Sequence, residues 1–112
     1  MTTRPQAEAI LKIDAPHVRV TEFRFAPGAE TGWHRHAVDY VVVPLTDGTV
    51  DVELPGGEVM RAENKAHVPY TRLAGVEHNV INAGDAPYAF LEIEILSPGG
   101  AAACSHGVLQ AG

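Results

Sequence analysis

Turn-forming clusters of Gly, Pro and Asp divide this sequence into short segments, and their spacing constrains the fold more than any other feature. APGAETG (26–32), PGG (55–57) and AGDAP (83–87) are such clusters, and TDG (46–48) has the Asp-Gly form typical of a hairpin. Turns recur about every 8–12 residues, and no helical period lasts more than a turn or two. The chain is therefore expected to be all-β, either a sandwich or a barrel.

The segments between these turns alternate their side chains as β-strands do. In VRVTEFRF (18–25), Phe23 and Phe25 share one face, while Glu22 and Arg24 share the other. About eight short strands are expected in the whole chain. Besides 18–25, the predicted strands are 33–45 (one strand or two), 49–54, 58–63, 76–82 and 88–96, with an ambiguous segment at 66–75.

The chain has 112 residues, which fits one domain. With 46% hydrophobic residues it can build a core without disulfides, and its single cysteine, Cys104, excludes an internal one. We expect an N-terminal arm or short helical turn at 1–16, a β-barrel domain at 17–96 and a loosely held tail at 97–112.

Charge and hydropathy exclude several classes of partner. The net charge is −6, whereas nucleic-acid binding depends on clustered Lys and Arg. No apolar run reaches the roughly 18 residues of a membrane helix, and the first residues, MTTRPQAEAILKID, lack the apolar region of a signal peptide. We therefore expect a soluble, cytoplasmic protein that binds neither nucleic acid nor membrane.

Two histidines, His34 and His36, stand one residue apart immediately before a β-branched run. In a strand, residues i and i+2 point to the same side, with Cα atoms roughly 6.6 Å apart. Two imidazoles at this spacing can bind one metal ion, and a third ligand must then come from another strand. His78, in the predicted strand 76–82, is the candidate. The remaining histidines lie at less suitable positions: His17, His67 and His106.

Three neighbours of the histidine pair need separate consideration. Tyr40 shares the parity of the pair and can donate a hydrogen bond, so it is either a catalytic contact or a core aromatic. Asp39 points away under strict alternation, and a β-bulge would be needed to turn it towards a metal. Trp33 also alternates away and is expected in core packing. Tyr40 is thus a candidate catalytic residue, and Asp39 a candidate fourth metal ligand.

Other charged residues offer weaker candidates. Glu92 and Glu94 alternate in the last predicted strand, and a partly solvated face is favoured over a place in the barrel mouth. Either Arg61 or Arg72 could meet a substrate carboxylate, because a guanidinium matches it bidentately. Cys104 lies in the Ala/Gly-rich tail with no fixed base near it and is expected to be inert.

The sequence resembles the cupin superfamily on the residues of two motifs. The first joins a glycine, a His-x-His pair and a later glycine, which here are Gly28, His34, His36 and Gly48. The second places a histidine and an asparagine after a glycine, which here are Gly75, His78 and Asn82. The usual glutamate of the first motif is absent, since Tyr40 or Val41 takes its place. The likeness is to small single-domain cupins, some of them labelled beta-alanine degradation proteins. It implies a double-stranded β-helix, or jelly-roll barrel, with a metal in its mouth.

These observations leave two main functions open. The first is a metal-dependent enzyme, of the oxygenase type or related, acting on a small carboxylate or carbonyl compound with His34, His36 and His78 around a divalent transition metal (Fe, Mn, Zn or Ni). The alternative is a binding or sensing module for a small molecule, and a third possibility is a relic with an empty site. A homodimer is also expected, because small barrels have sheet edges and apolar outer faces to cover.

Overall fold

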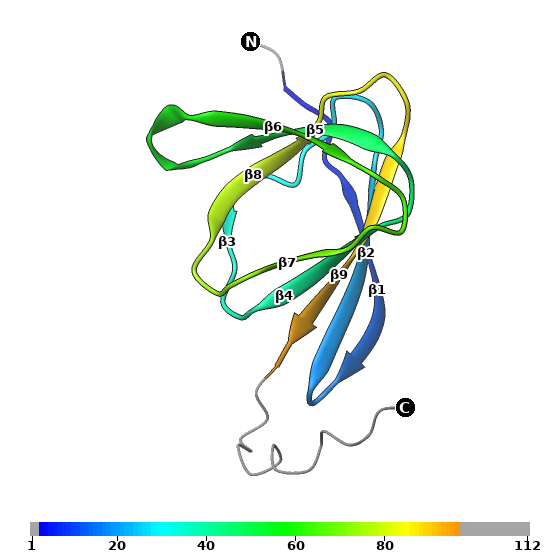
Figure 1. Ribbon diagram of the computed structural model, residues 1–112, viewed down its shortest axis with the longest axis vertical. Coiled ribbons are helices and arrows are strands. Elements are labelled where there is room, and N and C mark those ends of the chain that lie inside the picture. Colours follow the sequence, from blue (N-terminus) through cyan, green and yellow to red (C-terminus); the bar gives the residue numbers. More distant parts are fainter. Residues whose placement is uncertain (1–2, 97–112) are drawn as a thin grey trace.

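The computed structural model describes residues 3–96, which fold into nine strands and one short 3₁₀ turn (Figure 1). Most of the strands coincide with a segment whose side chains alternate or are β-branched. The elements are β1 (Glu8–Ala15), β2 (Val18–Phe25), β3 (His34–Arg35), β4 (Tyr40–Pro44), β5 (Gly48–Glu53), the 3₁₀ turn η1 (Pro55–Gly57), β6 (Val59–Asn64), β7 (Tyr70–Arg72), β8 (Glu77–Asn82) and β9 (Tyr88–Ile95).

The strands form two antiparallel sheets, one of five strands in the order β1-β2-β9-β4-β7 and one of four in the order β3-β8-β5-β6. Most strands that follow one another in the chain lie in different sheets, as β4 and β5 do and as β8 and β9 do, whereas β1–β2 and β5–β6 pair within one sheet. This pattern is the double-stranded β-helix, so the expected jelly-roll architecture is confirmed. Figure 1 shows the two sheets diverging around a central space, with β3 and β8 at its left and β7 and β4 running below it.

Two local predictions were wrong. Residues 1–16 were expected to form an arm or a helical turn, but residues 8–15 form β1, which pairs with β2 along its length at the edge of the five-stranded sheet. The Asp-Gly turn at 46–48 does not close a hairpin, because β4 and β5 belong to different sheets. The turn at 55–57 does close one, between β5 and β6. The predicted tail at 97–112, with Cys104 and His106, lies outside the described residues.

An aromatic floor fills the middle of the barrel. Phe25 from β2 lies with Tyr88 and Phe90 from β9, at ring-centroid distances of 5.8 and 5.5 Å. Gly48 at the start of β5 faces the Tyr88 ring, and a Cβ atom at this position would lie 2.9 Å from the ring's Cε1. Only a residue without a side chain therefore lets β5 approach this closely. The first cupin-like motif ends on this glycine for a packing reason.

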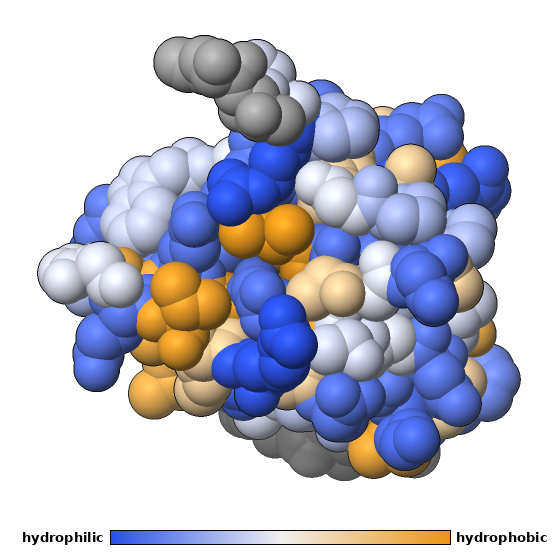
Figure 2. All heavy atoms as spheres, turned by 90° about the horizontal axis from the view of Figure 1, so that it is seen from above, coloured by the Kyte–Doolittle hydropathy of each residue, from blue (hydrophilic) through white to orange (hydrophobic). Residues whose placement is uncertain are grey.

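The surface carries several exposed apolar side chains. At the β5–β6 hairpin, Val59 and Met60 are 58% and 47% exposed. Figure 2, which views the molecule from above, shows hydrophobic groups gathered on the side where Figure 1 places this hairpin, within a largely hydrophilic surface. On the edge strand β1 of the five-stranded sheet, Leu11 and Ile13 are about half exposed, and so is Ile95 at the end of the central strand β9. No helix in residues 3–96 is long and apolar enough to span a bilayer.

Candidate metal centre

Backbone pairing brings the three predicted histidines together. His34 on β3 lies directly opposite His78 on β8, and directly opposed side chains in an antiparallel pair are close neighbours. His36 lies just beyond β3 but stays attached to the same neighbour: its amide donates to the Val76 carbonyl at 2.9 Å, and its own carbonyl accepts from the Gly75 amide at 2.8 Å. The three imidazoles therefore point to one side, into the barrel.

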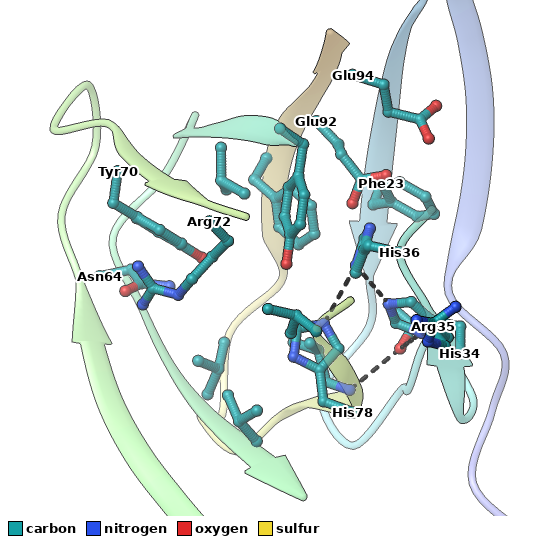
Figure 3. Close-up of a pocket in the computed structure, with 18 of the residues that line it drawn as sticks. Phe23, His34, Arg35, His36, Asn64, Tyr70, Arg72, His78, Glu92 and Glu94 are labelled. Carbon is teal, nitrogen blue, oxygen red and sulfur yellow. Dashed lines mark hydrogen bonds between the residues drawn. The ribbon is translucent and has the colours of Figure 1, made fainter. Parts of the chain in front are cut away.

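The imidazoles converge through their Nε2 atoms (Figure 3). Nε2 of His36 is 3.0 Å from Nε2 of His34 and 3.3 Å from Nε2 of His78. Two nitrogens that each lie about 2.1 Å from one ion are roughly 3.0–3.4 Å apart for bond angles between octahedral and tetrahedral. Within residues 3–96, this is the one group of three His, Cys, Asp or Glu side chains that could hold a metal ion.

The orientation of the His34 ring is fixed by a hydrogen bond on the side away from the cluster. Its Nδ1 lies 2.8 Å from the Gly32 carbonyl, which can only accept, so the Nδ1 proton donates and Nε2 keeps its lone pair for the centre of the cluster. Asn79 in turn holds Gly32, because its Oδ1 accepts from the Gly32 amide at 2.8 Å. The Asn79 amide nitrogen donates to the carboxylates of Glu30 and Glu53 at 2.8 and 2.9 Å, which fixes the direction of its oxygen.

Burial keeps two of the imidazoles neutral. His36 is only 6% exposed, and burial, followed by the charges of His34 and His78, lowers its pKa to about 4. The pKa of His78 is also lowered to about 4, by burial first and then by the charges of His34 and Arg72. A neutral imidazole is the form that binds a metal ion, so both residues are ready to act as ligands at neutral pH.

Tyr40 stacks directly on the cluster. Its ring lies parallel to that of His36, with centroids 3.8 Å apart and planes inclined by 19°. Its hydroxyl is the one buried side-chain N or O atom in residues 3–96 that has no hydrogen-bond partner. Burial first, then the negative charge of Glu92, raises its pKa to about 12. The group is therefore a protonated phenol that can donate a hydrogen bond.

Asp39 is not brought into the cluster. It is exposed, and its Oδ1 accepts a hydrogen bond from the Ala74 amide at 2.8 Å, which joins the segment before β4 to the one after β7. Trp33 was expected in core packing, but it is 51% exposed and donates from Nε1 to Glu77 at 2.7 Å. Asn82 of the second motif is 1% exposed and donates to the carbonyls of Phe25, Ala26 and Ala86, so it fastens turns near the aromatic floor.

The histidines open into a cavity of about 600 Å³ between the two sheets (Figure 3). Aliphatic side chains of β4, β5 and β8 form much of its wall, and Tyr88 and Phe90 form its floor. Besides the histidines, polar groups are few, and most of them stand on the five-stranded sheet, opposite β3 and β8: Tyr40, Tyr70, Arg72, Glu92 and Glu94. An apolar cavity with a small number of convergent polar groups is the usual form of a small-molecule site.

Glu92 is the main cavity residue that the sequence analysis misjudged. A partly solvated face was favoured, but Glu92 lines the cavity, and burial, followed by the charge of Glu94, raises its pKa to about 7. The sequence did offer one indication of this position: Glu92 alternates in register with Tyr88 and Phe90, so it lies on the same face of the strand as these two aromatic residues. Of the two arginines considered, Arg72 lines the cavity, whereas Arg61 forms an ion pair with Asp51 on the surface.

The fold and the site define a class of protein: a small double-stranded β-helix with convergent histidines at its cavity. Comparison with known proteins gives the family. The chain is 57% identical to the beta-alanine degradation protein BauB of Pseudomonas aeruginosa over 95 residues, covering 85% of this chain and 99% of that protein. The crystal structure of a cupin domain from Bordetella pertussis matches with a TM-score of 0.83 and 50% identity, over 87% of this chain and all of that one. This chain belongs to the cupin superfamily.

More distant structures share the fold. An uncharacterised protein with a double-stranded β-helix domain from Klebsiella pneumoniae matches with a TM-score of 0.69 at 20% identity, over 90% of this chain and 84% of that one. No family profile matches the sequence. The resemblance to cupins, first found on two short motifs, therefore extends over most of the chain.

Proposed function

We propose that His34, His36 and His78 hold one divalent transition metal, and that the protein is a metal-dependent enzyme of the oxygenase type or related, acting on a small carboxylate or carbonyl compound. The observation that supports this most directly is the convergence of three Nε2 atoms, at spacings suited to a single ion, on the edge of a largely apolar cavity. Three ligands on one side of an ion leave coordination positions open towards that cavity.

The donor set fits Fe, Mn, Zn or Ni, since imidazole is a ligand common to these metals. When bound, such an ion supplies a Lewis acid for a carbonyl or carboxylate group and, in the case of iron, a centre for oxygenase chemistry. Asp39 faces the Ala74 amide instead, so we do not assign it as the fourth ligand. The Tyr40 hydroxyl, unpartnered and protonated, would donate a hydrogen bond to a ligand atom held beside His36.

The arginines support a carboxylate ligand. Arg4, Arg19, Arg24 and Arg61 each form an ion pair with a carboxylate. Within residues 3–96, Arg35 and Arg72 do not, and these two arginines line the cavity.

Arg72 is also held in place. Its guanidinium lies 4.7 Å from the centroid of the Tyr70 ring and donates to the Thr71 carbonyl. A planar guanidinium fixed in this way is suited to bind a carboxylate. The name of the relative from Pseudomonas aeruginosa, which refers to beta-alanine, agrees with a small carboxylate compound.

The test combines metal analysis with turnover. The purified protein is expected to retain a divalent metal, and the variant with all three histidines changed to Ala is expected to retain none; equal metal content in both would disprove the site. Oxygen uptake by the iron-loaded protein with small carboxylates then tests the enzymatic function. Ligand binding without turnover would assign the protein to the alternative, a non-catalytic binding module.

We also propose that the protein is a homodimer. The support is the edge of the five-stranded sheet, where Leu11 and Ile13 expose apolar side chains on the edge strand β1. Sheet edges of this kind are commonly covered by self-association. Sedimentation should give twice the chain mass of 11.9 kDa at micromolar concentration, and a monomer there would contradict the proposal.

A further inference from the structure

Among the partly buried acids of residues 3–96, Glu92 alone has no ion-pair or hydrogen-bond partner. It lies on the inner face of β9, where its register partners are Thr21 on β2 and Val42 on β4. No residue in 3–96 forms an ion pair with it or donates a hydrogen bond to it. The other partly buried carboxylates of these residues each have such a partner: Glu22, Glu30, Asp51, Glu53, Glu77 and Glu94.

Arg35 and Arg72 likewise have no carboxylate partner within residues 3–96. These two arginines and Glu92 line the same cavity. Glu92 is partly buried, and a charge withdrawn from water without a partner is costly, whereas Arg35 and Arg72 are exposed to solvent at the cavity and free to meet a ligand. Arg72 does not compensate Glu92, since its guanidinium stacks on Tyr70 instead. The partners missing from the protein are therefore the ones that a ligand with charges of both signs would supply.

The register sets the scale of such a ligand. Val42 on β4 pairs with both Glu92 on β9 and Tyr70 on β7, while Arg72 pairs with the neighbouring Tyr40. Glu92 and Arg72 thus stand two strands apart on one inner face, roughly 10–12 Å apart at their Cα atoms. After both side chains extend into the cavity, the remaining gap fits a molecule with only a few carbon atoms between its charges. Figure 3 shows both residues on the wall that faces the histidines.

We propose that the cavity binds a small zwitterion, whose ammonium or amine group pairs with the Glu92 carboxylate and whose carboxylate is held by the guanidinium of Arg72. This inference deepens the proposed function, because it names the ligand class of the same site. The raised pKa of Glu92 agrees with it, since a carboxyl that lacks a cation in the empty cavity holds its proton more tightly. Tyr40, beside both groups, completes the polar wall.

The experiment is a calorimetric titration of the zinc-loaded full chain with three probes: β-alanine, which carries both charges, propionate, which lacks the ammonium group, and n-propylamine, which lacks the carboxylate. We expect β-alanine to bind at least tenfold more tightly than either. Glu92→Gln should bring the ratio of β-alanine to propionate affinity close to one while changing propionate affinity less than twofold, because the amide keeps the size of the side chain and loses its charge.

Glu22→Gln is the matched control. Glu22 is also a partly buried carboxylate of the five-stranded sheet, but it lies outside the cavity lining and pairs with Arg24 at 2.7 Å, so the preference for β-alanine should persist. Equal binding of β-alanine and propionate by the wild type, or an unchanged ratio in Glu92→Gln, would overturn the inference. Failure to bind zinc would instead disprove the metal site, and repeating the titrations on the metal-free protein would still test the role of Glu92.

Discussion

The two halves of β9 face the same barrel interior but have opposite characters. Tyr88 and Phe90 pack into the aromatic floor, where the Tyr88 hydroxyl accepts a hydrogen bond from Asn64 at 2.9 Å. Two residues further on, Glu92 has no partner among the described residues. Glu92 and the polar residues near it in the cavity form a group that we call the polar rim. Its members are His34, His36, Tyr40, His78 and Glu92.

The difference separates stability from function within one strand. The floor buries its polar atoms with partners, as a core does when only folding is at stake. The rim retains an unpartnered hydroxyl on Tyr40, an isolated carboxyl on Glu92 and three imidazoles whose lone pairs converge. Polar groups without partners are expected at a binding site, where a bound ligand supplies the missing partners. Changes in the rim should therefore alter binding, and changes in the floor should alter stability.

The largest effect is expected on metal affinity when a rim ligand is removed. His78→Ala should weaken zinc binding by about 100-fold or more, because two remaining imidazoles do not define the coordination geometry, and loss of an outer partner alone costs 10–100-fold. Competition with a chromophoric chelator measures this. The control is His17→Ala, an exposed histidine far from the cluster in sequence and outside it in space, which should bind zinc as the wild type does. Equal loss in both variants would contradict the assignment.

The floor should respond most strongly to a side chain at Gly48. Gly48→Ala places a Cβ atom against the Tyr88 ring, which is only 2% exposed and has little room to move. Overpacking of this kind costs about 1–3 kcal/mol in the free energy of unfolding. Urea denaturation measures it, and zinc affinity of the folded fraction should remain unchanged. Gly84→Ala is the matched control, since its Cβ would meet the nearest atom at an ordinary 3.5 Å.

Two buried asparagines on β8 sharpen the comparison, since Asn79 supports the rim and Asn82 supports the turns near the floor. Asn79→Ala removes the bond that positions Gly32 and, through its carbonyl, the His34 ring. We expect a loss of zinc affinity of about tenfold, in the range found for partners of metal ligands. NMR of the His34 Nδ1 proton should show a weakened hydrogen bond to Gly32. Asn82→Ala should lower stability and leave zinc affinity within twofold, and the reverse pattern would refute this division.

Much of the fold could be predicted from sequence because strands and turns are local. Alternation placed β2 and β9 within one residue of their observed bounds, and the His-x-His spacing identified residues that β3 and β8 bring together. The N-terminal strand was missed because most of β1 is exposed, so its residues follow no clear apolar alternation. The Asp-Gly turn was misassigned because which sheet a strand joins depends on long-range pairing.

The polar rim was harder to foresee than the histidines. Parity places Glu92 on a face but does not say whether that face meets solvent or a cavity, because this depends on the opposite sheet. Asp39 shows the converse: an acid adjacent in sequence to the histidines is used to bind the Ala74 amide. Arg72 differs from Arg61 only through its tertiary partners, since Arg61 meets Asp51 across the β5–β6 pair and Arg72 meets the cavity.

The smallest expected effect concerns the pH dependence of stability, and it tests whether Glu92 is isolated in the metal-free protein. Its folded-state pKa of about 7 lies above the ordinary value of 4.5, owing to burial and then to Glu94. Between these pH values the folded state keeps a proton that the unfolded state has released, so Glu92 lowers stability as pH rises through this window. Tyr40, Tyr70 and Arg72 are the other titratable groups near it.

Glu92→Gln removes this titration, and it should therefore match the wild type near pH 4 and become more stable as pH rises, levelling off above pH 7. We expect a gain of about 1 kcal/mol at high pH, well below the roughly 3 kcal/mol that 1.4 kcal/mol per pKa unit would give between 4.5 and 7, because the cavity admits solvent. Urea denaturation at a series of pH values measures the difference. Glu58→Gln, at an exposed site, should show no such trend. A difference between Glu92→Gln and wild type that does not vary with pH would mean that Glu92 is not isolated in solution, and the contrast between rim and floor would then rest on Tyr40 and the histidines alone.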